Sequence, residues 1–320
     1  MAAPTEPSAV SAVDAGPVTA RREIGAWSLL LRDRIALAAA IFLVLVALAA
    51  ILADVLVHLD VLIDPIRQNL LGRNKPPFTE TKLGFHLLGT DQLGRDLLSR
   101  LIFGARISLG VGVLTIIVSS LIGVTLGLVA GCRGGRVDDL IMRLVDIQMG
   151  FPQMLLALIV IYAAGPSVVN LILVLALTRW MAIARVTRAT TLSLRQTLFV
   201  EAARSLGATH VRIIVFHILP NLTSTLLILV SLEFGRVMLS EAGLSFLGMG
   251  VQPPDASWGL MLAQGRSYIG SAWWLVTFPG LAIALTTLST NLLAGWARSV
   301  NDPVYRKRMV QRSLRRARPA

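Results

Sequence analysis

Long stretches without any charged residue are the feature that most constrains this chain. An α-helix needs about 20 apolar residues to cross the roughly 30 Å hydrocarbon core of a bilayer. Four charge-free stretches reach that length: residues 107–132, 147–178, 213–232 and 267–297. Another apolar run covers 35–53, behind Arg32 and Arg34. Hydrophobic residues make up 55% of the chain and charged residues only 15%, which leaves too little polar surface for a water-soluble body. The sequence therefore predicts an integral membrane protein.

The second charge-free stretch is too long for one helix, and Gly165-Pro166 interrupts it. Dividing it there predicts six transmembrane helices, at 35–57, 107–131, 144–164, 167–187, 221–243 and 276–297. We therefore expect an all-α polytopic membrane protein. Its expected parts are a disordered tail with a basic flank (1–34), the first transmembrane helix (35–57), an extracytoplasmic loop with an interfacial helix (58–106), a five-helix core (107–297) that includes a cytoplasmic loop (188–220), and a basic tail (298–320).

The positions of Lys and Arg predict the orientation. The net charge is +12, with 30 Lys+Arg against 18 Asp+Glu. Such an excess could mark a nucleic-acid binder, but here the basic residues gather between the spans, as in cytoplasmic loops. We therefore expect contact with membrane lipid and no nucleic acid, with both termini cytoplasmic in a cell membrane. The loop 58–106 departs from the rule, since it carries seven basic residues although it must lie outside.

The predicted cytoplasmic loop before the fifth helix contains two short motifs. The first runs from Glu201 through Ala202 and Ala203 to Gly207, and the second is Leu219-Pro220. Gly207 can end a helix, so the loop predicts a short helix–turn–helix on the inner membrane surface. Such a unit could fit a groove in a cytosolic partner, or it could be an amphipathic interfacial helix without one.

This loop resembles the EAA motif in the permease subunits of ATP-binding cassette (ABC) importers. The resemblance implies a type I importer permease fold similar to that of the methionine importer. It also implies a coupling helix that sits in a cleft of an ATPase subunit. The implied contact residues are Glu201, Ala202, Ala203, Gly207, Leu219 and Pro220.

Two further stretches resemble the C-type subunits of the dipeptide, oligopeptide and nickel importers. They are 88–109, with its Gly-Thr-Asp and Gly-Arg-Asp elements, and 239–259. One departure is that the usual His-Pro-Leu-Gly opening reads His-Leu-Leu-Gly at 86–89. Asp96 and Arg100 have the i,i+4 spacing of a helical ion pair. A docking surface for an external binding protein is predicted at Asp91, Arg95, Asp96 and Arg100.

Charged residues inside the predicted fifth helix require an explanation. Glu233 and Arg236 stand at i,i+3, and Glu241 lies near the outer end of the helix. The simplest interpretation is that Glu233 and Arg236 pair with each other. The alternative is that all three line the translocation path, where a zwitterionic peptide would meet charges of both signs.

Glycines and prolines predict how the helices pack and bend. Gly123, Gly127 and Gly131 recur every four residues, a spacing that lets another helix approach closely, either in this chain or in a partner permease. Pro152 is expected to kink the third helix.

No motif for chemistry by this chain is found. The sequence has no G-x-x-x-x-G-K-[ST] phosphate loop, no H-E-x-x-H and one cysteine. Its four histidines are scattered, without a carboxylate at catalytic spacing. We expect no enzyme activity, no metal and no cofactor on this chain, with ATP and Mg bound by partner ATPase subunits.

The resemblance to these C-type subunits implies a permease subunit of an ATP-driven importer of dipeptides or short oligopeptides. The resemblance implies a second, homologous permease, two ABC ATPase subunits and an extracytoplasmic peptide-binding protein. A permease for nickel or another solute, a proton-coupled secondary transporter using Glu233 or Glu241, and a membrane scaffold are the alternatives. The secondary transporter and the scaffold would leave the match at 201–221 unexplained.

Overall fold

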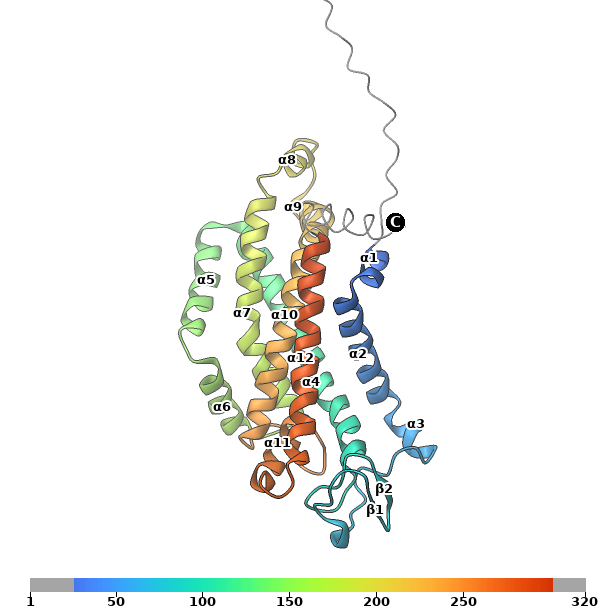
Figure 1. Ribbon diagram of the computed structural model, residues 1–320. Coiled ribbons are helices and arrows are strands. Elements are labelled where there is room, and N and C mark those ends of the chain that lie inside the picture. Colours follow the sequence, from blue (N-terminus) through green and yellow to red (C-terminus); the bar gives the residue numbers. More distant parts are fainter. Residues whose placement is uncertain (1–25, 302–320) are drawn as a thin grey trace, which may run out of the picture.

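The computed structural model describes residues 26–301, which form a bundle of long helices (Figure 1). In this part of the chain five helical stretches are long and apolar enough to cross a membrane. They are α2 (Arg34–Ile51), α4 (Leu97–Arg133), α7 (Val168–Leu194), the stretch His210–Phe246 that ends in α10 (Leu219–Phe246), and α12 (Trp274–Asn301). The bent pair α5 (Gly135–Met149) and α6 (Gln153–Ala164) raises the number to six if it forms one span. The predicted all-α polytopic fold is confirmed.

The shorter elements lie at the two ends of the bundle. They are α1 (Ala26–Arg32), α3 (Ala53–His58), the 3-10 turns η1 (Leu70–Gly72) and η3 (Arg266–Tyr268), the strands β1 (Thr79–Thr81) and β2 (Gly84–His86), α8 (Leu198–Ser205), α9 (His210–Ile213), the π-helical turn η2 (Ile214–Ile218) and α11 (Trp258–Gly265). The strands β1 and β2 pair antiparallel, with Thr79 opposite His86. Figure 1 shows α8 and α9 at one end and the hairpin with α11 at the other. Both ends of the described chain, α1 and the last turn of α12, lie toward α8 and α9. The predicted tails fall mostly in 1–25 and 302–320, outside the described residues.

The second span begins earlier than the sequence predicts. We expected an interfacial helix in the loop 58–106, followed by a span from 107. Instead α4 is one continuous helix from Leu97 to Arg133, and the described loop before it contains η1 and the hairpin. The start is fixed by Asp96, whose side chain accepts a hydrogen bond from the Ser99 backbone N–H. This is an N-cap, which satisfies a donor that the first helical turn leaves unpaired.

The third predicted span, 144–164, is broken rather than merely kinked. α5 ends at Met149, α6 begins at Gln153, and their axes meet at 88°. Pro152 causes the break, because proline disfavours helical backbone at the residue before it and has no N–H to donate. Figure 1 shows α5 and α6 following one another along one side of the bundle, joined by a short non-helical segment.

The glycine strip of α4 packs against α7 in the same chain. An added Cβ at Gly127 would lie 2.6 Å from both the Ala184 carbonyl oxygen and Thr187 Cβ. At Gly123 it would lie 2.6 Å from the Trp180 carbonyl oxygen, and at Gly131 2.7 Å from Thr191 Cβ. These contacts decide between the two predicted alternatives: the strip lets α7, rather than a partner, approach α4.

Replacing Gly127 with alanine is therefore expected to lower the free energy of unfolding by about 1–3 kcal/mol, the usual effect of overpacking. The matched control is Gly110→Ala on the same helix, where a Cβ meets nothing within 4 Å. That substitution should be neutral or stabilising by up to about 1 kcal/mol, because glycine is a poor helix former. Denaturant titration in detergent measures both changes. Equal effects of the two substitutions would contradict the packing role.

Candidate functional site

The loop between α7 and α10 projects from one end of the bundle (Figure 1). α8 ends at Ser205, and Gly207 follows with a φ of +81°. This left-handed backbone favours glycine and turns the chain toward α9. Leu219 and Pro220 form the first turn of α10, directly after the π-helical turn η2. The two predicted motifs thus belong to one helix–turn–helix, although Pro220 does not interrupt the helical path from His210 to Phe246.

One side of this unit is anchored in the bundle. Val200, Ile213, Ile218 and Leu222 form a buried cluster, and Ala203 packs partly buried against it. Among the predicted contact residues, Ala203 therefore faces the bundle and supports the loop.

The other side of the unit is exposed and carries large apolar side chains among charged ones. Glu201 and Ala202 are exposed, and Leu206 is 88% exposed. Leu198, Val211 and Phe216 are exposed as well. Val211 and Phe216 belong to the lining of an open hollow of about 510 Å³, together with Thr209, Arg212, Val215 and His217. Exposed apolar patches bordered by polar residues mark surfaces that contact other proteins or membranes.

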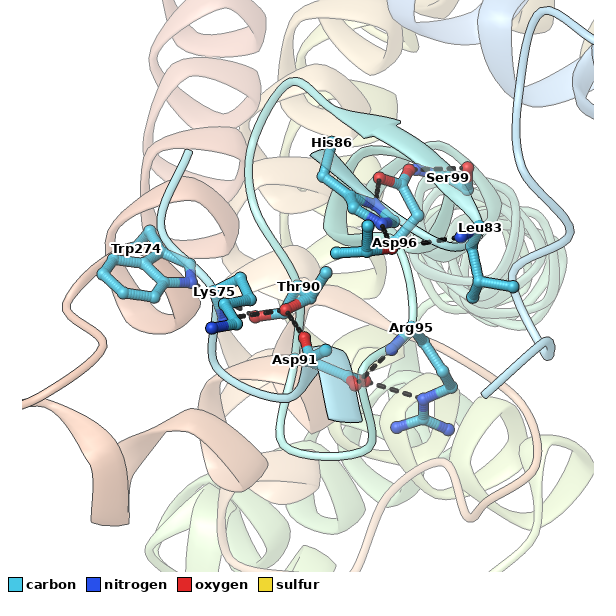
Figure 2. A network of polar contacts seen from close by, with 11 residues as sticks. Lys75, Leu83, His86, Thr90, Asp91, Arg95, Asp96, Ser99 and Trp274 are labelled. Atoms are coloured by element: carbon cyan, nitrogen blue, oxygen red, sulfur yellow. Dashed lines mark hydrogen bonds and ion pairs between the residues drawn. The ribbon is translucent and has the colours of Figure 1, made fainter. Parts of the chain in front are cut away.

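At the opposite end, buried charges hold the loop before α4 (Figure 2). The Asp91 carboxylate accepts hydrogen bonds from the backbone N–H groups of Leu93 and Arg95, each at 2.9 Å. It also pairs with the guanidinium Nε of Arg95 at 2.7 Å and of Arg100 at 3.5 Å. Gly94 allows this turn to lie close to the backbone of Asn69, because a Cβ at position 94 would lie only 1.8 Å from the Asn69 carbonyl oxygen.

A second set of contacts joins the hairpin to α4. His86 is buried, with Nδ1 2.8 Å from Asp96 Oδ1 and Nε2 2.8 Å from the Thr81 hydroxyl. The other Asp96 oxygen accepts from the backbone N–H and the hydroxyl of Ser99. The Trp274 indole N–H of α12 donates to the Thr90 carbonyl, which fixes the loop to the bundle (Figure 2).

These contacts correct three predictions. Arg100 pairs with Asp91 rather than with Asp96, and His86 has a carboxylate neighbour that the sequence spacing did not reveal. Asp91, Arg95, Asp96 and Arg100 are all buried, so these side chains cannot form the outer surface on which another protein docks. Their role in the structure is to hold the loop.

Glu241 is also buried, in a network of hydroxyl groups. Its carboxylate accepts from Ser108 of α4 at 3.3 Å and from Ser245 of α10 at 2.8 Å. The Ser108 hydroxyl accepts from the Trp258 backbone N–H, and Ser245 from that of Val251. Glu241 therefore joins α4 and α10 to the segment that leads into α11, and it does not face a path in this chain.

Glu241→Ala is expected to lower the free energy of unfolding by about 2 kcal/mol or more, because buried hydroxyls left without a partner each cost about 1–3 kcal/mol. Glu241→Gln keeps an acceptor oxygen and should cost less than about 1 kcal/mol. Glu80→Ala, at an exposed position of β1, is the control and should change stability by less than about 0.5 kcal/mol. Denaturant titration measures all three. A glutamine variant as unstable as the alanine variant would contradict the network.

A further group of charged residues comes from α10 and α7. Arg236 Nη1 donates to Glu233 at 2.7 Å, so the predicted pair forms. Arg179 of α7 adds a second cation, 3.6 Å from Glu233, and donates to Ser240 at 2.6 Å. The structure buries the Arg179 side chain between α7 and α10, with only 11% exposed.

Comparison with known proteins finds a family whose sequences resemble this chain. Residues 123–307 match the family described as "Binding-protein-dependent transport system inner membrane component". This stretch contains the exposed α8 loop, Glu233, Arg236 and Glu241.

Two relatives match most of the chain. The di/tripeptide transport system permease protein DppC of Pseudomonas aeruginosa is 39% identical, over 87% of this chain and 90% of that protein. The glutathione transport system permease protein GsiD of Pectobacterium atrosepticum is also 39% identical, over 87% of this chain and 89% of that protein.

Among solved structures, the fold is similar to that of a chain of the MetNI methionine ABC transporter. The TM-score is 0.54 at 18% identity, and the match covers 64% of this chain and 98% of that chain. At this identity the likeness shows the fold alone.

Proposed function

This chain belongs to the family of binding-protein-dependent transport system inner membrane components, and we propose that it carries short peptides inward as one permease of an ATP-driven importer. The single observation that supports the substrate class is the match, over 87% of the chain, to a permease named for di- and tripeptides. The relative named for glutathione transports a molecule that is itself a short peptide. The proposed path forms between this chain and a second, homologous permease.

The energy source in this proposal is a pair of ABC ATPase subunits that bind ATP and Mg, while this chain binds no cofactor. The exposed face of α8, with Glu201, Ala202 and Leu206, is the surface that would enter a cleft of the ATPase. Gly207 shapes the turn, and Ala203 with Leu219 transmits the movement into α10. ATP-driven closure of the ATPases would then open the path outward, and hydrolysis would reset it.

Orientation follows from this assignment. The α8 end of the bundle, together with both ends of the described chain, would be cytoplasmic in a cell membrane. The hairpin end would then receive the external peptide-binding protein. Since the four charged residues there are buried, we place the docking surface on exposed apolar side chains of the same loop, namely Leu71, Phe78 and Phe85.

Purification and uptake test this proposal. The tagged chain, isolated from its native membrane in a mild detergent, should retain stoichiometric ATPase subunits and one similar permease. The same complex in proteoliposomes, with its binding protein, should accumulate di- and tripeptides only when ATP is supplied. Uptake driven by a proton gradient without ATP would identify a secondary transporter instead. Accumulation of nickel but not of peptides would overturn the substrate class.

A further inference from the structure

The charged group formed by α10 and α7 contains more cations than anions. One carboxylate, Glu233, contacts two guanidinium groups, those of Arg236 and Arg179. The formal charge of the group is therefore +1. The two acid groups of α10 on which the expected path depended, Glu233 and Glu241, are both buried.

Exposure decides which charge is available to a solute. The side chain of Glu233 is 1% exposed and that of Arg236 is 65% exposed. Within the described chain the Arg236 guanidinium donates one hydrogen bond, to Glu233, although a guanidinium has five N–H donors. Glu233 thus holds Arg236 in place and leaves most of its donors available on the outer face of α10.

Hydrocarbon would be an unfavourable environment for this side chain. Arg236 lies ten residues before Phe246, the last residue of α10, or about 15 Å from that end at 1.5 Å per residue. A charged side chain so deep in a bilayer costs several kcal/mol, and such residues face water-filled cavities or paired groups. No second carboxylate of the described residues lies within ion-pair distance of Arg236. Within the described residues, the exposed side of the guanidinium is therefore open to water or to a solute.

We propose that Arg236 is the carboxylate-binding residue of the translocation path and engages the C-terminal carboxylate of a passing peptide. The planar guanidinium matches a carboxylate in geometry and charge. Between passages it remains hydrated, which a permanently buried interface pair does not allow. This assignment rests on the proposed function and sharpens it, because the path then presents one positive charge rather than charges of both signs.

The central variant is Arg236→Gln. It leaves Glu233 with Arg179, a matched pair of one anion and one cation, so the fold should tolerate the change. Arg236→Lys keeps the charge but not the fork of donors. The control is Arg185→Gln, which removes another exposed arginine from an ion pair, here with Asp146.

The assay uses the intact complex in proteoliposomes with its binding protein and ATP. The probe is an equimolar mixture of di- and tripeptides with free C-termini, quantified inside the vesicles by mass spectrometry. We expect Arg236→Gln to slow uptake about 10- to 100-fold, the range of a lost charge-assisted hydrogen bond. Arg236→Lys should retain more uptake than the glutamine variant, and Arg185→Gln should stay near the wild type.

The outcomes separate the possible failures. Wild-type vesicles that take up no peptide would overturn the proposed function, and this inference with it. Normal peptide uptake by Arg236→Gln would overturn the inference alone. Loss of the second permease from the purified Arg236→Gln complex would place Arg236 in the interface between permeases and also overturn it. If both variants slow uptake equally, the forked guanidinium is required and a positive charge alone is not sufficient.

Discussion

Asp91→Asn is expected to lower the free energy of unfolding by about 3–5 kcal/mol, the usual cost of removing one partner from a buried ion pair. The Asp91 carboxylate faces Arg95 and Arg100, and all three side chains are buried. Asparagine can still accept hydrogen bonds from the backbone N–H groups of Leu93 and Arg95. The change in stability therefore reports the removal of the negative charge alone. Denaturant titration of the purified protein in detergent, followed by tryptophan fluorescence, measures the change.

Asp54→Asn is the matched control for this prediction. Asp54 pairs with Arg106 at 2.9 Å, but both side chains are substantially exposed. Exposed ion pairs contribute about 0–1 kcal/mol, since water solvates each charge separately. A loss at Asp91 no larger than that at Asp54 would mean that the buried charges do not hold the loop before α4.

The second large effect is expected at the cytoplasmic surface proposed for α8. Leu206→Asp should reduce the ATPase subunits recovered with the purified complex, and ATP-driven uptake, at least about tenfold, since a charge there would be buried unpaired against the partner. The chain itself should keep its stability, because Leu206 is 88% exposed. Quantitative mass spectrometry of the purified complex and an uptake assay provide the two measurements.

Leu71→Asp provides the control for position, since Leu71 is 82% exposed at the opposite end of the bundle. Its ATPase content should match that of the wild type. Val200→Asp, on the buried side of α8, should instead destabilise the chain. It therefore serves as the reference for a loss of ATPase content caused by misfolding. Undiminished ATPase content in Leu206→Asp would place the ATPase contact elsewhere.

The sequence by itself determined the membrane-spanning character of the chain and the approximate positions of its helices. Charge-free stretches carry this information locally, because each span must satisfy its backbone hydrogen bonds within itself. The motifs at Glu201 and Gly207 likewise predicted a helix and a turn at that point, and α8 and Gly207 form them. Local spacing also predicted the Glu233–Arg236 pair.

Tertiary structure alone decided which charges are buried and which groups contact each other across the chain. His86 meets Asp96 through a hairpin, Arg100 turns to Asp91 instead of the residue one helical turn away, and Arg179 joins Glu233 from another helix. The hydroxyls of Ser108 and Ser245 around Glu241 carry no local signal. The physical reason is that a buried charge depends on every group that surrounds it, and those groups come together only when distant segments pack.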